Sequence, residues 1–337
     1  MHARVLLPGL LSPTRKLADR PALPALETLL RQGRLDWHAG SSHEKVLAEC
    51  FGLPADDIPV AALRRLGERD EAAVDGCWLC ADPVTLRFNR EHLLLDDADD
   101  SGLSATEAAA LLEALNNHFL AIEKDFVRFE ARSARRWYLR LKSRPQVDLA
   151  PLGAVLGRPV EGFLPSGEEA ARWRRLINEA QVLMHNHPVN QAREAAGKPL
   201  VNSLWFWGSG TLPETLHAPA PVLRTDDRLA LGCGRLAGMR CEGLSSRTPS
   251  RATLIVDTRL LRPALRVDVH GWHDGLRKLD AKCLQPLLAA LKKRQLSSLH
   301  ITAAGDRATL DLTIRPLDLL KIWRRPRPLE HILTHEA

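Results

Sequence analysis

The segment His187–Gly210 reads HPVNQAREAAGKPLVNSLWFWGSG and combines directional polar side chains with aromatic and turn residues. Ligand pockets that orient a small polar molecule need this combination, since a few polar groups fix the ligand between apolar walls. A buried polar network that holds a helix–strand junction has the same composition. The residues of interest are His187, Asn190, Arg193, Asn202, Trp205, Trp207, Gly208 and Gly210.

The residues on either side of this segment predict two kinds of domain. Short apolar runs such as Ala3–Leu7, Leu254–Val256 and Leu310–Ile314 alternate with helical patterns, which is typical of an α/β sheet. Residues 76–210 instead predict strands at Cys77–Phe88, Phe126–Glu130 and Trp137–Lys142, with two long helices between and after them. We therefore expect an α/β core of residues 1–75 and 211–337, interrupted by an α+β domain of residues 76–210.

The later part of the chain carries further local predictions. Alternation indicates a strand over Leu265–Val269, and an amphipathic helix over Leu276–Lys293 is expected to kink or break at Pro286. A capping-box pattern at Ser166 and Glu169 predicts the start of a helix that ends near His187.

Composition places the chain among globular proteins with an ordinary apolar core. Of 337 residues, 45% are hydrophobic and 26% are charged, which excludes a mainly disordered chain. No apolar run approaches the roughly 18 residues of a membrane span. Six cysteines are too few for a disulfide scaffold, so we expect reduced thiols and a cytoplasmic location.

Positive charge is concentrated towards the end of the chain. The net charge is +6, and residues 251–337 hold 16 basic and 9 acidic residues. This imbalance suits a nucleic-acid partner as well as an ordinary solvated surface. Trp323 beside Arg324, Arg325 and Arg327 is the candidate nucleic-acid site, because an aromatic ring stacks on bases while arginines pair with phosphates.

Two further clusters raise the question of metal binding. Asp268, His270, His273 and Asp274 offer carboxylate and imidazole groups within seven residues, with Asp268 and His270 expected on one strand face. An ordinary polar strand end is the alternative. Cys77 and Cys80 form a C-x2-C pair in an apolar strand, but a zinc site needs a second such pair.

The motif HPVN-x2-R followed by N-x2-W-x-W-G-x-G resembles that of the archaeal-type, cofactor-independent phosphoglycerate mutases of the alkaline-phosphatase superfamily. Pro24–Gly33, Ser41–Gly52 and Leu276–Leu291 resemble other parts of that family. A bacterial group, the RpfE-type regulatory proteins, shares this combination of motifs, and the chain resembles that group more closely than it resembles the mutases. The resemblance implies an alkaline-phosphatase-like, doubly wound α/β sheet with an inserted α+β domain.

The resemblance also implies chemistry: two divalent ions held by Asp and His, and a Ser or Thr that carries the phosphoryl group. Ser41 or Ser42 stands at the nucleophile position. The first strand, however, ends in Leu6–Leu10 without a carboxylate, and the later Asp and His pairs are out of register. The sequence thus favours a catalytically degenerate, regulatory or adaptor protein without a cofactor.

In that interpretation the partner is an unidentified protein or a small anionic metabolite. His187, Asn190 and Arg193 are expected to orient the anion, with Asn202 and the two tryptophans as pocket walls. The first alternative is an active, metal-dependent phosphomutase or phosphohydrolase. The second is a nucleic-acid-associated protein that uses the basic end of the chain.

Overall fold

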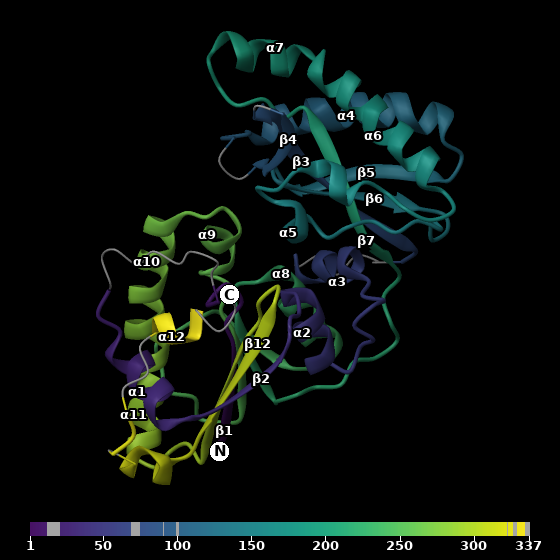
Figure 1. Cartoon of the computed structure of the whole chain (residues 1–337). Helices are drawn as coiled ribbons and strands as arrows, with labels where there is room; N and C mark the ends of the chain where they lie inside the picture. Colours follow the sequence, from purple (N-terminus) through teal and green to yellow (C-terminus); the bar gives the residue numbers. More distant parts are fainter. Residues whose placement is uncertain are drawn as a thin grey trace. The chain divides into compact units, whose positions relative to one another are not determined.

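A computed structural model describes residues 1–11, 21–68, 75–89, 91–98, 101–321, 323–325 and 329–333 of the chain. The chain forms two compact units, Met1–Asp57 with Thr215–Ala337 and Ile58–Glu214 (Figure 1). The second unit starts before the expected residue 76, because the helix α3 (Val60–Gly67) packs on strands of that unit. Each unit is described by itself.

A seven-stranded sheet with the order β2-β12-β11-β1-β10-β8-β9 forms the centre of the first unit. Its strands are β1 (His2–Leu6), β2 (Arg34–Ala39), β8 (Val222–Thr225), β9 (Arg240–Glu242), β10 (Thr253–Val256), β11 (Ser298–Ala303) and β12 (Ala308–Ile314). Only β12 runs antiparallel to its neighbours, so the other six strands end at one common edge.

Helices cover both faces of this sheet (Figure 1), which confirms the predicted doubly wound α/β class. Alternate strand positions such as Val5, Ile301 and Leu312 are buried in the core on one face. The helices on that side are α1 (Pro24–Gln32), α9 (Leu261–Leu265), α10 (Val269–Leu279), α11 (Gln285–Lys292) and the short α12 (Leu329–Leu333). On the opposite face lie α2 (His43–Cys50) and α8 (Arg228–Leu236).

The predicted break at Pro286 is confirmed. Helix α10 ends at Leu279, a π-helical turn spans Asp280–Leu284, and Pro286 lies in the first turn of α11, where its missing N–H costs no hydrogen bond. The buried Asp280 carboxylate accepts from the backbone N–H of Leu26 at 2.7 Å and so caps the start of α1.

Two of the local predictions are wrong. Leu265–Val269 is no strand: it ends α9 and begins α10, with Val267 in the left-handed region at φ 55°. The helix α6 (Ala170–His185) begins after Glu169, not at Ser166. The Glu169 carboxylate accepts from the backbone N–H of Gln146, whereas a capping box requires it to accept from that of Ser166.

The second unit is an antiparallel five-stranded sheet, with the long β3 (Cys77–Asn89) pairing with three others. The remaining strands are β4 (His92–Asp97), β5 (Phe126–Ser133), β6 (Arg136–Leu141) and β7 (Ser203–Gly210). Helices α4 (Ala105–Ile122) and α6 cover one face over an aromatic core, and α3 contacts the other. Shorter elements are α5 (Leu152–Val155), η2 (Val160–Phe163), α7 (Pro188–Ala195) and, in the first unit, η4 (Pro316–Leu320).

No helix among the described residues is both long and apolar enough to cross a lipid bilayer.

Candidate active site at the carboxyl edge of the first unit

Polar residues gather where the strands of the seven-stranded sheet end. This is the edge at which open α/β sheets bind their ligands. Each of these residues comes shortly after a strand: Ser41, Ser42 and His43 after β2, Asp226 and Asp227 after β8, Asp257 and Arg259 after β10, and Asp306 after β11. The four aspartates escaped the sequence analysis, although each comes within three residues of the end of a short strand.

The loop after β1 contributes packing rather than a carboxylate to this edge. Gly9 adopts φ 81°, and a Cβ atom built there would lie 2.5 Å from the carbonyl oxygen of Leu260. The indole of Trp272 donates to the Gly9 carbonyl at 2.7 Å. The segment Leu6–Leu10 thus packs against the loop after β10.

Ser42 occupies the N-cap of α2. Its hydroxyl accepts from the backbone N–H of Lys45 at 3.3 Å, and its neighbour Ser41 donates its backbone N–H to Gly305 at 2.9 Å. These contacts fix both serines at the carboxyl edge.

His43 is buried beside Asp227. Its Nε2 lies 3.8 Å from Asp227 Oδ1, too far for a hydrogen bond, and it has no other hydrogen-bond partner. Burial acts to lower the pKa of His43, but the Asp227 carboxylate, helped by Glu44, outweighs it and holds the pKa above its ordinary value. Asp227 itself caps α8, accepting from the backbone N–H of Ala230 at 2.8 Å. The Asp227 carboxylate therefore favours the protonated form of His43.

Asp257 and Arg259 form a second pair at this edge. The Asp257 side chain is 0% exposed, and Arg259 Nε donates to its two oxygens at 2.7 and 2.9 Å. Its backbone N–H donates to Leu6 at 3.1 Å, which holds it between the ends of β1 and β10. The carboxylate beside the first strand is thus already hydrogen-bonded to a guanidinium.

The donor set does not fit the two-ion site that the family resemblance implies. Within the described ranges, no three His, Cys, Asp or Glu side chains are placed to hold one metal ion. Asp257 gives both oxygens to Arg259, and the loop after β1 has no carboxylate.

The candidate ligands Asp268, His270, His273 and Asp274 do not lie on a strand face, contrary to the prediction. Asp268 caps α10, accepting from the backbone N–H of Gly271 at 2.9 Å, and the other three lie on that helix. Asp274 pairs with Arg277 at 2.6 Å. Helical spacing replaces the expected alternation, so the four do not form a cluster.

The residues of the predicted ligand pocket form hydrogen bonds with backbone groups. The buried Asn190 amide donates to the carbonyls of Met184 and Val201 at 2.7 and 2.8 Å, and its oxygen accepts from the Val201 N–H. Asn202 bonds both backbone groups of Leu86, and His187 caps α7 through Nδ1. These contacts join the α7–β7 connection to its neighbours.

Arg193 is equally committed to protein groups. Its side chain is 1% exposed and pairs with Glu107 at 3.0 Å. It also donates to the carbonyls of Pro199, at 2.9 Å, and Ser101. Whether any of the residues from His187 to Gly210 also holds a ligand stays a prediction.

Trp205 and Trp207 lie on the other face of β7 from Leu204 and Phe206, which belong to the aromatic core. The Trp205 indole donates to Ala150 at 2.9 Å, and that of Trp207 to Asp82 at 2.8 Å. Gly208 and Gly210 lie further along β7. A Cβ atom built at Gly208 would lie 2.7 Å from the first residue of α3, and one built at Gly210 would lie 2.7 Å from the residue before that helix. The eight residues thus divide between two faces of the sheet.

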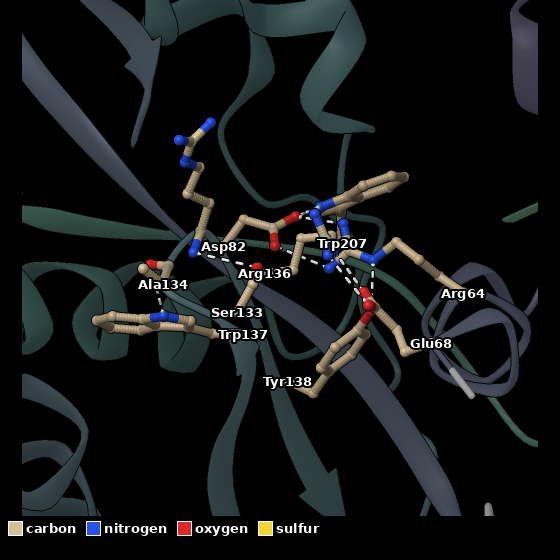
Figure 2. A network of polar contacts seen from close by, with 10 residues as sticks. Arg64, Glu68, Asp82, Ser133, Ala134, Arg136, Trp137, Tyr138 and Trp207 are labelled. Carbon is tan, nitrogen blue, oxygen red and sulfur yellow. Dashed lines mark hydrogen bonds and ion pairs between the residues drawn. The ribbon is translucent and has the colours of Figure 1, made fainter. Parts of the chain in front are cut away.

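Figure 2 shows the polar network that Trp207 joins. Arg64 of α3 donates to both oxygens of Asp82 at 2.8 and 2.7 Å, and its Nε donates to the Tyr138 hydroxyl at 2.9 Å. Tyr138 and Arg136 in turn contact the Glu68 carboxylate. Burial raises the pKa of Tyr138, so the phenol stays neutral. The network attaches α3 to the sheet.

The remaining candidates have simpler surroundings. Cys77 and Cys80 are buried strand residues, and all six cysteines are free. Arg324 Nη1 donates to the carbonyls of Gln32 and Gly33 at the end of α1, whereas Arg325 is exposed. Arg327 lies outside the described residues.

Comparison with known proteins points to one enzyme family. A family model described as 2,3-bisphosphoglycerate-independent phosphoglycerate mutase matches residues 72–190. The chain is 24% identical to a mutase of that name from Methanosarcina mazei, over 91% of this chain and 75% of that protein. It is 29% identical to a probable mutase from Geobacter sulfurreducens, over 71% and 67% of the two chains. With the Methanosarcina barkeri mutase it shares 30% identity, over 50% and 44%.

A solved structure supports the fold. The PH0037 protein from Pyrococcus horikoshii matches with a TM-score of 0.53 and 13% identity, over 93% of this chain and 87% of that one. The relatives are named as enzymes, which contradicts the expected degenerate, regulatory role. The chain is related to the 2,3-bisphosphoglycerate-independent phosphoglycerate mutases.

Proposed function

We propose that this chain is a phosphomutase or phosphohydrolase that acts on a small phosphorylated acid at the carboxyl edge of the first unit. The relationship to phosphoglycerate mutases supports the substrate class. The observation that carries the site is the Ser42 hydroxyl at the N-terminus of α2, directly before the buried His43 with its neighbour Asp227.

The chemistry follows from these groups. As the Ser42 Oγ–P bond forms, the P–O bond of the substrate breaks. The Ser42 hydroxyl releases one proton and the leaving oxygen takes one up, so the transfer needs no net proton. The phosphoryl group on Ser42 then carries negative charge at the positive end of the α2 dipole, where backbone N–H groups stabilise it. A protonated His43 adds a cation and a proton source. Return of the phosphoryl group to a second hydroxyl makes a mutase, and transfer to water makes a hydrolase.

Turnover of 3-phosphoglycerate by the full chain, followed by phosphorus NMR, tests this proposal. We expect product from the wild type and none from Ser42→Ala, with parallel reactions in Mn²⁺ and in chelator. Because Ser42→Ala also removes a helix cap, worth about 1 kcal/mol, Ser104→Ala is the matched control. Ser104 caps α4 in the second unit, so its loss should leave turnover unchanged. Equal turnover in Ser42→Ala, or none from the wild type in either reaction, would refute the proposal.

Several finer expectations stay predictions. Binding of an anionic metabolite or a protein partner at His187–Gly210 is one of them, and nothing in the comparisons supports the RpfE-type resemblance. The six free cysteines support the expected cytoplasmic location, since oxidising compartments favour disulfides.

A further inference from the structure

A groove lies on the face of the seven-stranded sheet that points away from the main core. Its volume is about 700 Å³, the size of a small-molecule site, and strands β1, β11, β12 and β2 form its floor. Side chains on a strand alternate between the two faces. Here Val5, Ile301 and Leu312 point into the core, so their neighbours along each strand face the groove.

Strand register places four of these neighbours in one row. Arg4 pairs with His300, His300 with Thr313, and Thr313 with Arg34. Thr313 Oγ1 and His300 Nδ1 lie 3.1 Å apart. Directly opposed residues of neighbouring strands lie about 5 Å apart, so one ligand can contact several members of the row. The row offers two guanidiniums, an imidazole and a hydroxyl.

A second row, two residues further along the strands, is acidic. Asp311 pairs with Asp36 in the register. Asp36 accepts from Arg34 Nε at 3.1 Å, whereas Asp311 accepts from Thr302 at 2.6 Å and lies 3.2 Å from His38. Both carboxylates, and with them Arg34, are already engaged.

Arg4 is the exception in the groove. Its side chain is exposed, and it has no hydrogen-bond or carboxylate partner among the residues that the structure describes. An unpaired guanidinium beside an imidazole and a hydroxyl suits an oxyanion, because charge-assisted hydrogen bonds are the strong ones. The acidic row disfavours a long polyanion, which would extend over Asp36 and Asp311.

We propose that this groove binds a small anion bearing a phosphate or carboxylate group, held by Arg4 with His300 and Thr313 beside it. None of these residues belongs to the candidate active site. The site is therefore independent of the proposed function.

The charges around His300 give the site a pH dependence. Burial and the nearby cations Arg4, His2 and Arg315 lower the pKa of His300, and Asp311 opposes them weakly. A bound anion favours the imidazolium, so binding takes up a proton. Affinity for an anion of constant charge, such as sulfate, should therefore rise as the pH falls from about 7.5 to about 5.5.

Anion titrations of the full chain test the proposal. Inorganic phosphate and acetate distinguish the two anion classes, and the His300 imidazole NMR signal, assigned by its loss in His300→Gln, reports on this groove alone. Arg4→Gln should weaken phosphate binding about tenfold or more, since the lost hydrogen bonds are charged. Arg34→Gln removes the same charge from the same row but breaks an existing ion pair, so it should weaken binding far less.

The pH arm uses sulfate with the wild type and with His300→Gln, which should lose the rise in affinity at low pH. Thermal unfolding confirms that each variant is folded. Unchanged phosphate binding by Arg4→Gln, or a His300 signal that neither anion moves, overturns the proposal. So does binding of a single-stranded oligonucleotide in the absence of phosphate or acetate binding.

Discussion

The segment His187–Gly210 and the carboxyl edge of the first unit use polar side chains differently. In the segment, the side chains of Asn190, Arg193 and Asn202 form most of their hydrogen bonds with backbone groups. At the carboxyl edge, His43 lies buried beside a carboxylate without a hydrogen bond. A high density of polar residues along the sequence can therefore indicate a structural junction between elements. The candidate active site is instead assembled from residues of separate segments.

The physical reason lies in the backbone. Val201, close to the start of β7, is fully buried, and its backbone carbonyl and N–H groups need partners. Asparagine and arginine provide donors that reach over several residues, so they gather at such a junction. A site at strand ends has no such concentration, because each strand contributes only one or two residues.

The largest effect is expected from Arg193→Ala. The change leaves the carbonyls of Ser101 and Pro199 without their donor and Glu107 without its cation. Removing one partner of a buried, hydrogen-bonded pair costs about 3–5 kcal/mol, measurable as a lower free energy of unfolding in urea.

Arg87→Ala is the matched control for Arg193→Ala. It breaks an exposed pair with Asp96 in the same unit, worth about 0–1 kcal/mol. A cost for Arg193→Ala as small as that of the control would contradict the architectural role and favour ligand binding.

Asp82→Ala is expected to cost nearly as much, about 3 kcal/mol. It leaves the Arg64 guanidinium unpaired and the Trp207 indole without its acceptor. The double variant Arg64→Ala/Asp82→Ala should lose less than the sum of the two single changes, since no buried charge remains unpaired. Additive costs in urea unfolding would show that Figure 2 depicts two independent contacts.

Local patterns predicted most of the fold. Proline at 286 and the alternation in β5 and β6 each identified an element that the structure contains. The predicted strand at Leu265–Val269 was wrong because Asp268 caps a helix there. Aspartate is also common in turns, so its presence did not identify the start of a helix.

The site was less accessible to such reasoning. Ser42 was found through the family resemblance, whereas Asp227 and Asp257 became visible only when the strand order brought their loops to one edge. Neither residue stands in a local motif. Register across distant strands also created the row of Arg4 and His300, which no window of sequence contains.

A smaller effect separates two adjacent arginines at the basic end. Arg324→Ala removes both hydrogen bonds to the end of α1 and should cost about 1–2 kcal/mol in urea unfolding. Arg325→Ala changes an exposed side chain and should stay within about 0.5 kcal/mol. Equal costs would mean that the contact with α1 contributes nothing to stability.

The smallest effect concerns pH and tests the carboxyl edge directly. Because the folded-state pKa of His43 lies above its ordinary value of 6.5, its contribution is fully present below that value. It is lost as the pH rises through the folded-state pKa. Asp227→Asn removes the charge but keeps a good helix cap, so urea unfolding between about pH 6 and 8 should show less decline than in the wild type. Identical declines would mean that Asp227 does not stabilise the protonated form of His43.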